Sequence, residues 1–201
     1  MKRTIALSLF AAGLALNGSA LAEAVVGQQA PAFKGVDAAG KPVSLDQYKG
    51  KYVVLEWVNP DCPFVKKHYD SGNMPVTQKY AADKGVVWLS VSTSADGDNS
   101  KKSAAINDWV KAKKAMPTAT IMDTGGAIGR AYGARTTPHM YLIDPAGKLV
   151  YAGAIDSKPT ANASDIKGAT NYMTLAIDEA LAGKTLSQAV TKPYGCSVKY
   201  S

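Results

Sequence analysis

Cysteine is scarce in this chain: Cys62 and Cys196 are the only two among 201 residues. Two cysteines cannot build a disulfide-dense scaffold, and a hydrophobic content of 46% is enough for an ordinary buried core. A local C-x-x-C pair is also missing, because Val65 stands three residues after Cys62. Each cysteine therefore needs its own explanation.

Apolar runs long enough to cross a membrane are missing as well. The stretch at residues 5–16 is about a dozen residues long, whereas a membrane-spanning helix needs about 20. It follows Lys2-Arg3 and precedes Ala20-Leu21-Ala22, which matches the A-x-A cleavage pattern. This order predicts a signal peptide, residues 1–22, cleaved after Ala22. Because no cysteine adjoins the cleavage point, no stable membrane anchor is expected.

Export predicts that the protein is periplasmic, and disulfides can persist in that compartment. Residues 23–201 have a length typical of one domain and show no internal repeat. Loss of Lys2-Arg3 lowers the formal charge from +7 to +5. The lysines within residues 101–114 favour a solvated helix face over an anionic partner, and no nucleic-acid partner is expected. The glycines of residues 125–129 lack the spacing of a phosphate loop, and no cofactor or metal is expected.

Short apolar runs alternate with amphipathic stretches along the chain. Strands are expected at residues 52–58, 86–91, 118–122, 140–143 and 148–152, after an N-terminal hairpin within residues 32–51. Helices are expected at residues 63–69, 74–84, 100–115, 126–132 and 172–181. The polar residues 155–169 predict an exposed loop or lid. The order predicts an α/β fold with a mixed β-sheet flanked by helices on both faces and an N-terminal β-hairpin extension.

Cys62 lies where a strand is expected to give way to a helix. Pro63 suits the first position of a helix, because its missing N–H would be unpaired there anyway. Cys62 is then at or next to the N-cap, where free backbone N–H groups and the helix dipole stabilise a thiolate. The pattern favours a nucleophilic thiolate over a small buried cysteine that only packs.

A second informative segment, residues 132–139, precedes a core strand and contains Thr137-Pro138. A proline at a strand entrance cannot donate to the ladder, and an X-Pro bond tolerates the cis form. The order strand, cysteine, helix, Thr-Pro, strand, turn, strand resembles the thioredoxin fold. That resemblance implies a cis-proline loop that faces Cys62 and guides an incoming sulfur or oxygen substrate.

Several motifs between about Gln29 and Lys199 occur in a familiar order: Asp61-Cys62-Pro63-Phe64-Val65-Lys66, Ala131-Tyr132-Gly133-Ala134, Thr137-Pro138, Tyr151-Ala152-Gly153-Ala154-Ile155-Asp156 and Gly195-Cys196-Ser197-Val198-Lys199. Together they resemble a peroxiredoxin-like branch of the alkyl hydroperoxide reductase/thiol-specific antioxidant (redoxin) family. The resemblance implies a thioredoxin-like fold and an antioxidant oxidoreductase. Its substrate would be a peroxide or a protein disulfide, and an external thiol would reduce it.

The resemblance also implies roles for individual residues. Cys62 is the nucleophile, and Asn59 stands where peroxiredoxins carry Thr or Ser. Pro63 and Thr137-Pro138 are expected to contact the substrate. The guanidinium of Arg135 is expected beside the thiolate, although a solvent-facing loop arginine would look the same in the sequence.

Cys196 lies in a small tail, Gly195-Cys196-Ser197, that is flexible enough to fold back. Three roles stay open for it: a resolving cysteine, a partner in a permanent structural disulfide, or a free thiol. A bond to Cys62 would close a loop of 134 residues. Such a loop constrains the unfolded chain by about 4–5 kcal/mol.

Three other functions are compatible with the residues. The first is thiol–disulfide exchange without peroxidase activity. The second is a copper carrier that uses Cys62 with His139 or Cys196, which the absence of a second close thiol disfavours. The third is a binding module that the disulfide merely staples. His68 and His139 are weaker candidates for a catalytic base, because a thiolate at a helix start does not require one.

Overall fold

The computed structural model describes residues 23–94 and 99–200, so the expected signal peptide lies outside the described residues. The helices are α1 Pro63–Asp70, α2 Asn73–Asp83, α3 Asn99–Ala112, α4 Ala127–Tyr132 and α5 Tyr172–Leu181. The strands are β1 Lys34–Val36, β2 Pro42–Ser44, β3 Val53–Trp57, β4 Val87–Ser94, β5 Ala119–Thr124, β6 Thr136–Thr137, β7 His139–Ile143, β8 Leu149–Gly153 and β9 Cys196–Ser197. Short 3₁₀ helices span Leu45–Tyr48 and Ala163–Gly168.

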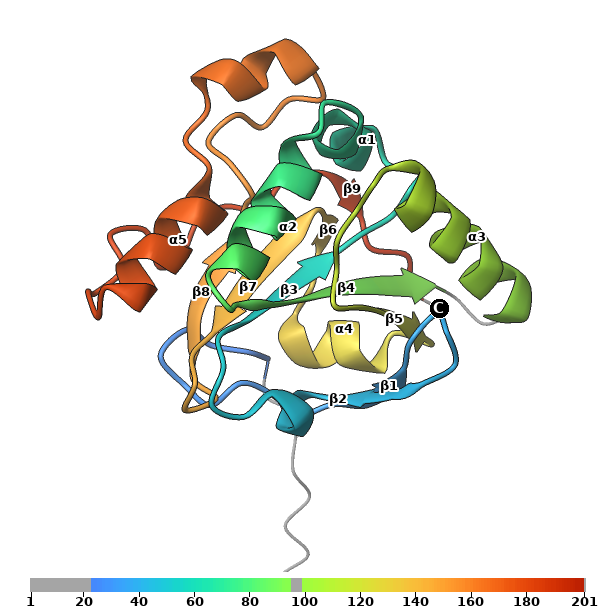
Figure 1. Cartoon of the computed structure of the whole chain (residues 1–201), viewed down its shortest axis with the longest axis horizontal. Helices are drawn as coiled ribbons and strands as arrows, with labels where there is room; N and C mark the ends of the chain where they lie inside the picture. The colour runs from blue at the N-terminus through green and yellow to red at the C-terminus, as the bar shows by residue number, and fades with distance from the viewer. Residues whose placement is uncertain (1–22, 95–98, 201) are drawn as a thin grey trace, which may run out of the picture.

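A five-stranded mixed sheet forms the centre of the molecule, in the order β5-β4-β3-β7-β8 (Figure 1). β3, β4 and β5 are parallel, whereas β7 pairs antiparallel with both β3 and β8. The parallel strands follow from the βαβ crossovers, and β7 and β8 form a hairpin. The expected mixed sheet is confirmed.

Both faces of the sheet are covered, so the central strand β3 is buried along its whole length. Leu55 and Trp57 belong to the core on one face, where α4 and the β1–β2 hairpin pack. Val54 and Cys62 belong to the core on the other face, where α1, α2 and α5 pack. Because successive residues of a strand point to opposite faces, β3 contributes to both cores. Cys62 lies in the turn between this buried strand and α1.

The N-terminal hairpin is confirmed: β1 and β2 pair antiparallel, with Gly35 opposite Val43. An isolated bridge between Asp37 and Ile121 joins the hairpin region to β5. Within the described ranges, the chain contains no helix with the length and apolar character needed to cross a membrane.

Two segments are more structured than the sequence pattern indicates. The loop at residues 155–169 is exposed over most of its length, but it begins with buried Ile155 and Asp156 and contains the 3₁₀ helix Ala163–Gly168. The tail around Cys196 folds back toward Cys62, as the sequence allowed, and β9 pairs there with β6. Short strands of two residues give no periodic signal in a sequence, so this pairing could not be recognised from the pattern.

Candidate functional site

Cys62 occupies the N-cap of α1, and Pro63 is at its first position, as predicted. The Cys62 N–H donates to the carbonyl of Asn59 at 3.1 Å, which closes the turn between β3 and α1. The Cys62 residue is only 2% exposed. Its sulfur therefore lies at the positive end of a helix, with little access to solvent.

Asn59 shapes this turn through its side chain. Its Oδ1 accepts the backbone N–H of Asp61 at 2.9 Å, an arrangement typical of an Asx turn. The amide oxygen of Asn59 thus supports the backbone just before Cys62. A direct role of Asn59 toward a substrate stays a prediction.

The loop before β7 meets Cys62 from the other side. The Thr137-Pro138 bond is cis, as expected, and the Thr137 carbonyl oxygen lies 3.1 Å from the Cys62 Sγ. A reduced thiol could donate to this oxygen, whereas a thiolate would face a partial negative charge. The carbonyl and the helix start therefore act in opposite directions on the ionisation of Cys62.

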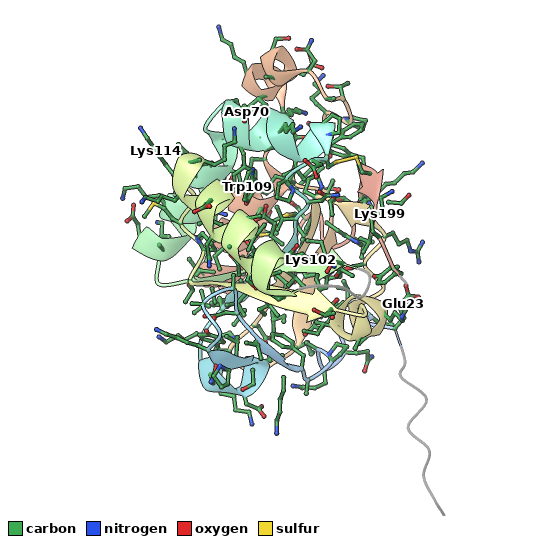
Figure 2. All side chains as sticks on the ribbon, turned by 90° about the vertical axis from the view of Figure 1, so that its right-hand side faces the viewer. Glu23, Asp70, Lys102, Trp109, Lys114 and Lys199 are labelled. Atoms are coloured by element: carbon green, nitrogen blue, oxygen red, sulfur yellow. A yellow bond between two sulfur atoms is a disulfide. The ribbon has the colours of Figure 1, made fainter. Side chains whose placement is uncertain are left out.

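Cys196 completes the site by forming a disulfide with Cys62, with a Cα–Cα distance of 5.9 Å (Figure 2). Cys196 lies opposite Thr137 in the β6–β9 pair. Gly195 has φ +136°, and a Cβ at that position would lie 2.0 Å from the Thr137 carbonyl oxygen. Only glycine allows the tail to approach so closely. Of the three roles left open for Cys196, the free thiol does not apply to this state.

Arg135 lies next to the site but points its guanidinium elsewhere in this structure. Its side chain is 74% exposed and pairs with Glu23 at 3.3 Å. Its backbone carbonyl accepts the N–H of Val198 at 3.0 Å, which fixes the tail just after Cys196. A role of the Arg135 side chain toward the sulfur stays a prediction.

His139 packs away from Cys62. It pairs with Trp57 across the sheet and its ring contacts Tyr141, and both aromatic residues belong to the core on the opposite face. Burial, with a smaller effect from the Arg135 guanidinium, lowers the pKa of His139 to about 3. The proposed copper ligands Cys62 and His139 are therefore not brought together. Residues 23–94 and 99–200 contain no cluster of three or more His, Cys, Asp or Glu side chains suited to a metal.

Sequence reasoning missed a buried polar cluster beside α1, which consists of Lys67, His68, Asp156 and Tyr194. The side chains of Lys67 and His68 are 0% exposed and that of Asp156 is 2% exposed. The Lys67 Nζ lies 3.4 Å from the Asp156 carboxylate and donates to the Lys158 carbonyl at 2.8 Å. Lysine side chains are usually exposed, so the burial of Lys67 could not be inferred from the sequence. The one signal of this cluster in the sequence was Tyr194, which stands two residues before Cys196.

A second buried polar group is Glu56, in the middle of β3. Its carboxylate accepts hydrogen bonds from Tyr69, Gln78, Trp88 and Ser90. Burial raises the pKa of Glu56, and these hydrogen bonds oppose the rise. A single carboxylate inside an otherwise apolar strand was the signal that could have identified it.

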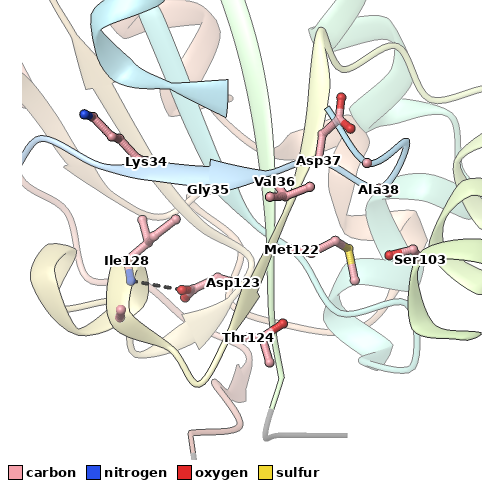
Figure 3. A pocket seen from close by; sticks show the side chains of 12 residues that line it. Lys34, Gly35, Val36, Asp37, Ala38, Ser103, Met122, Asp123, Thr124 and Ile128 are labelled. Carbon is pink, nitrogen blue, oxygen red and sulfur yellow. Dashed lines mark hydrogen bonds between the residues drawn. The ribbon is translucent and has the colours of Figure 1, made fainter. Parts of the chain in front are cut away.

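One pocket lies beside the turn that precedes Cys62, and another lies beside the β1–β2 hairpin. One of about 390 Å³ opens beside the turn before Cys62 and is lined by Asn59, Asp61, Lys102 and Lys199, among others. Figure 2 shows both lysines on the same side of the molecule as the disulfide. The other, of about 640 Å³, lies between β1, β5 and α4 (Figure 3). Its Asp123 is committed to the backbone N–H groups that begin α4, and its lining contains no cysteine or histidine.

Comparison with known proteins gives a consistent picture. The AhpC/TSA family profile matches residues 26–152. The "Thiol-disulfide oxidoreductase ResA" of Bacillus thuringiensis subsp. konkukian is 30% identical over 125 residues, which cover 62% of this chain and 67% of that protein.

Solved structures support the fold. A hypothetical protein from Sinorhizobium meliloti 1021 matches with a TM-score of 0.72 and 22% identity, over 90% of this chain and 97% of the other. The thioredoxin domain of a thiol-disulfide oxidoreductase from Bacteroides vulgatus matches with a TM-score of 0.51 and 24% identity, over 72% of this chain and 96% of that one. The expected thioredoxin-like fold is confirmed.

Proposed function

This chain belongs to the AhpC/TSA family, and we propose that it is a thiol–disulfide oxidoreductase whose redox couple is Cys62–Cys196. The observation that carries the proposal is the bond between a cysteine at a helix start and a cysteine that strand pairing holds beside it. Because Val65 excludes a local C-x-x-C pair, Cys196 supplies the second thiol from 134 residues away. The name of the ResA relatives supports the same class of reaction.

The proposed reaction has two thiol-exchange steps. The Cys62 thiolate attacks one sulfur of a substrate disulfide, forms a mixed disulfide and expels a substrate thiolate. The Cys196 thiolate then attacks the Cys62 sulfur, releases the second substrate thiol and leaves the Cys62–Cys196 disulfide. Two electrons and two protons pass from the protein dithiol to the substrate. An external thiol reductant reverses both steps and restores the dithiol.

Helix α1 contributes to this chemistry by stabilising negative charge on Cys62. A thiolate that leaves easily makes the oxidised protein easier to reduce, because exchange is faster when the departing thiol is more acidic. The turn built by Asn59 and the loop at Thr137-Pro138 hold the sulfur from two sides. These are the residues we propose to contact the substrate, together with Pro63.

Peroxide reduction is the second candidate, and membership of the AhpC/TSA family favours it. Cys62 would attack the O–O bond and become a sulfenic acid, and Cys196 would condense with it and release water. Both candidates end in the same disulfide. We favour thiol–disulfide exchange, because the groups expected to hold a peroxide have other partners. The Asn59 amide oxygen accepts a hydrogen bond from the Asp61 N–H, and the Arg135 guanidinium forms an ion pair with Glu23. An antioxidant role depends on this second candidate.

The proposal is tested with the reduced protein and two probes, glutathione disulfide and hydrogen peroxide. Cys196→Ser should accumulate a mixed disulfide between Cys62 and glutathione, seen by mass spectrometry, whereas the wild type should proceed to the Cys62–Cys196 bond. Cys62→Ser should react slowly at Cys196. Faster oxidation of the wild type by hydrogen peroxide than by glutathione disulfide would favour peroxide reduction. Equal reactivity of the two single-cysteine variants would contradict Cys62 as the nucleophile.

We further propose that the protein is exported to the periplasm with cleavage after Ala22. The charged and apolar order of residues 1–22 supports this, as does the disulfide, which persists in an oxidising compartment. N-terminal sequencing of the protein from the periplasm should begin at Glu23, and a retained Lys2 would contradict the cleavage.

A further inference from the structure

Tyr194 connects the Cys196 tail to the buried cluster of Lys67, His68 and Asp156. Its hydroxyl donates to the Asp156 carboxylate and accepts from the His68 Nε2, which lies at 3.1 Å. Its ring packs edge-on against Phe64, with centroids 5.8 Å apart. The Lys67 Nζ lies 5.5 Å from the centroid of the same ring. One side chain of the tail thus contacts three side chains of α1 and that of Asp156, three residues after the end of β8.

The donor and the acceptor of each hydrogen bond around Tyr194 can be assigned. The Asn73 amide N–H group donates to the His68 Nδ1 at 2.8 Å, so the proton of the neutral ring is on Nε2 and faces the Tyr194 oxygen. Burial, together with the Lys67 charge and against the pull of Asp156, lowers the pKa of His68 to about 4. Tyr194 therefore accepts from His68 and donates to Asp156. A hydroxyl can do both at once, and a phenylalanine can do neither.

Tyr194 is close enough to Cys196 in the chain to affect where Cys196 lies. Only Gly195 separates it from Cys196, and the Gly195 backbone packs so closely against Thr137 that a Cβ on Gly195 would lie 2.0 Å from the Thr137 carbonyl oxygen. On the other side of Cys196, the Val198 N–H donates to the Arg135 carbonyl at 3.0 Å. Cys196 is thus held from both directions by contacts that do not depend on its own sulfur.

We propose that Tyr194 is a positioning residue that keeps Cys196 beside Cys62 after the disulfide is reduced. This inference rests on the proposed function, in which Cys62–Cys196 is the redox couple. A docked tail gives the Cys196 thiol a high effective concentration at the Cys62 sulfur. Resolution of a mixed disulfide on Cys62 then competes well with release of the partner, although the two cysteines are far apart in sequence.

Tyr194→Phe is the direct test, because it removes the hydroxyl and keeps the ring against Phe64. Oxidation of the dithiol removes two electrons and two protons and forms the S–S bond, and a glutathione buffer supplies the acceptor. Loss of a hydrogen bond to a charged group changes an equilibrium by about tenfold or more. We expect a roughly tenfold smaller equilibrium constant for disulfide formation, which corresponds to a midpoint potential about 30 mV higher. We also expect faster alkylation of Cys196 in the reduced, native protein.

Tyr80→Phe is the matched control, because it removes another tyrosine hydroxyl that donates to a carboxylate. That hydrogen bond, from Tyr80 in α2 to Asp178 in α5, is exposed. It should leave both the potential and the alkylation rate unchanged. Asp156→Asn is a second variant that weakens the acceptor without removing the ring, and it should shift both readouts in the same direction as Tyr194→Phe. Far-UV circular dichroism of each variant establishes that it is folded.

The outcomes separate this inference from the proposed function. A wild-type disulfide that does not titrate in the glutathione buffer contradicts the proposed function itself. A wild-type couple that titrates, with an unchanged potential and an unchanged Cys196 alkylation rate in Tyr194→Phe, overturns the role of Tyr194 alone. Equal shifts in Tyr194→Phe and Tyr80→Phe would also overturn it, because the effect would not be specific to the tail.

Discussion

Loss of the Cys62–Cys196 disulfide should lower the free energy of unfolding by about 5 kcal/mol. The bond closes a loop of 134 residues, and the chain-entropy relation gives a loss of about 17 cal/mol/K for a loop of that length, or about 5 kcal/mol at 25 °C. With an m-value of about 2–3 kcal/mol/M, the urea midpoint falls by about 2 M. The reduced wild type and a variant that lacks both cysteines should still fold, because the two cores on either side of the sheet do not depend on the bond.

Urea unfolding followed by far-UV circular dichroism would test this expectation. The samples are the oxidised wild type, the wild type in excess dithiothreitol, and the double variant Cys62→Ser/Cys196→Ser, which cannot re-form the bond. The reduced wild type and the double variant should agree with each other. A difference below about 1 kcal/mol from the oxidised protein would refute the loop-closure reasoning. Failure of the reduced wild type to fold would refute the independence of the core.

Three further predictions concern the tail and the buried cluster. Gly195→Ala should prevent formation of the disulfide in most molecules, because at φ +136° the new Cβ would lie 2.0 Å from the Thr137 carbonyl oxygen. Thiol titration of the denatured variant should then count two free thiols. A fully formed disulfide would contradict the prediction. Folding lowers the pKa of His68 from 6.5 to about 4, so as the pH falls the unfolded state binds a proton before the folded state does. The free energy of unfolding should therefore decrease by on the order of 3 kcal/mol between pH 6.5 and pH 4. His68→Gln should lose less over that range in urea unfolding, and an identical pH profile would contradict the assignment. Lys67→Met should cost about 3–5 kcal/mol by leaving the Asp156 carboxylate buried without its counter-ion; the double variant with Asp156→Asn should recover part of that loss, and strict additivity in urea unfolding would contradict a direct interaction.

The parts of the site that follow from local signals could be predicted from the sequence. The apolar run of β3 and the proline at the start of α1 placed Cys62 at a helix N-cap, and the structure has it there. The Thr137-Pro138 loop and the β7–β8 hairpin were recognisable in the same way. In each case the residues that determine the conformation are neighbours in the chain.

The buried cluster could not be predicted, because its members are distant in sequence. Lys67 and Asp156 are 89 residues apart, and Asp156 and Tyr194 are 38 apart. Lysine and aspartate side chains are usually exposed, and only the packing of the tail against α1 encloses these two. The same holds for Cys196, whose approach to Cys62 depends on the close contact of Gly195 with a loop that no local pattern connects to it.

The measurement that tests the central claim most directly is a redox titration of the wild-type protein in glutathione buffers, with alkylation and mass spectrometry as the readout. If Cys62–Cys196 is a working redox couple, the folded protein should convert between dithiol and disulfide at a midpoint potential above about −300 mV. Structural disulfides have potentials below that value. Cys62→Ser and Cys196→Ser should form no intramolecular disulfide and at most a mixed disulfide with glutathione. A disulfide that stays fully oxidised in excess reduced glutathione, while the protein remains folded, would contradict the account and assign the bond a structural role alone.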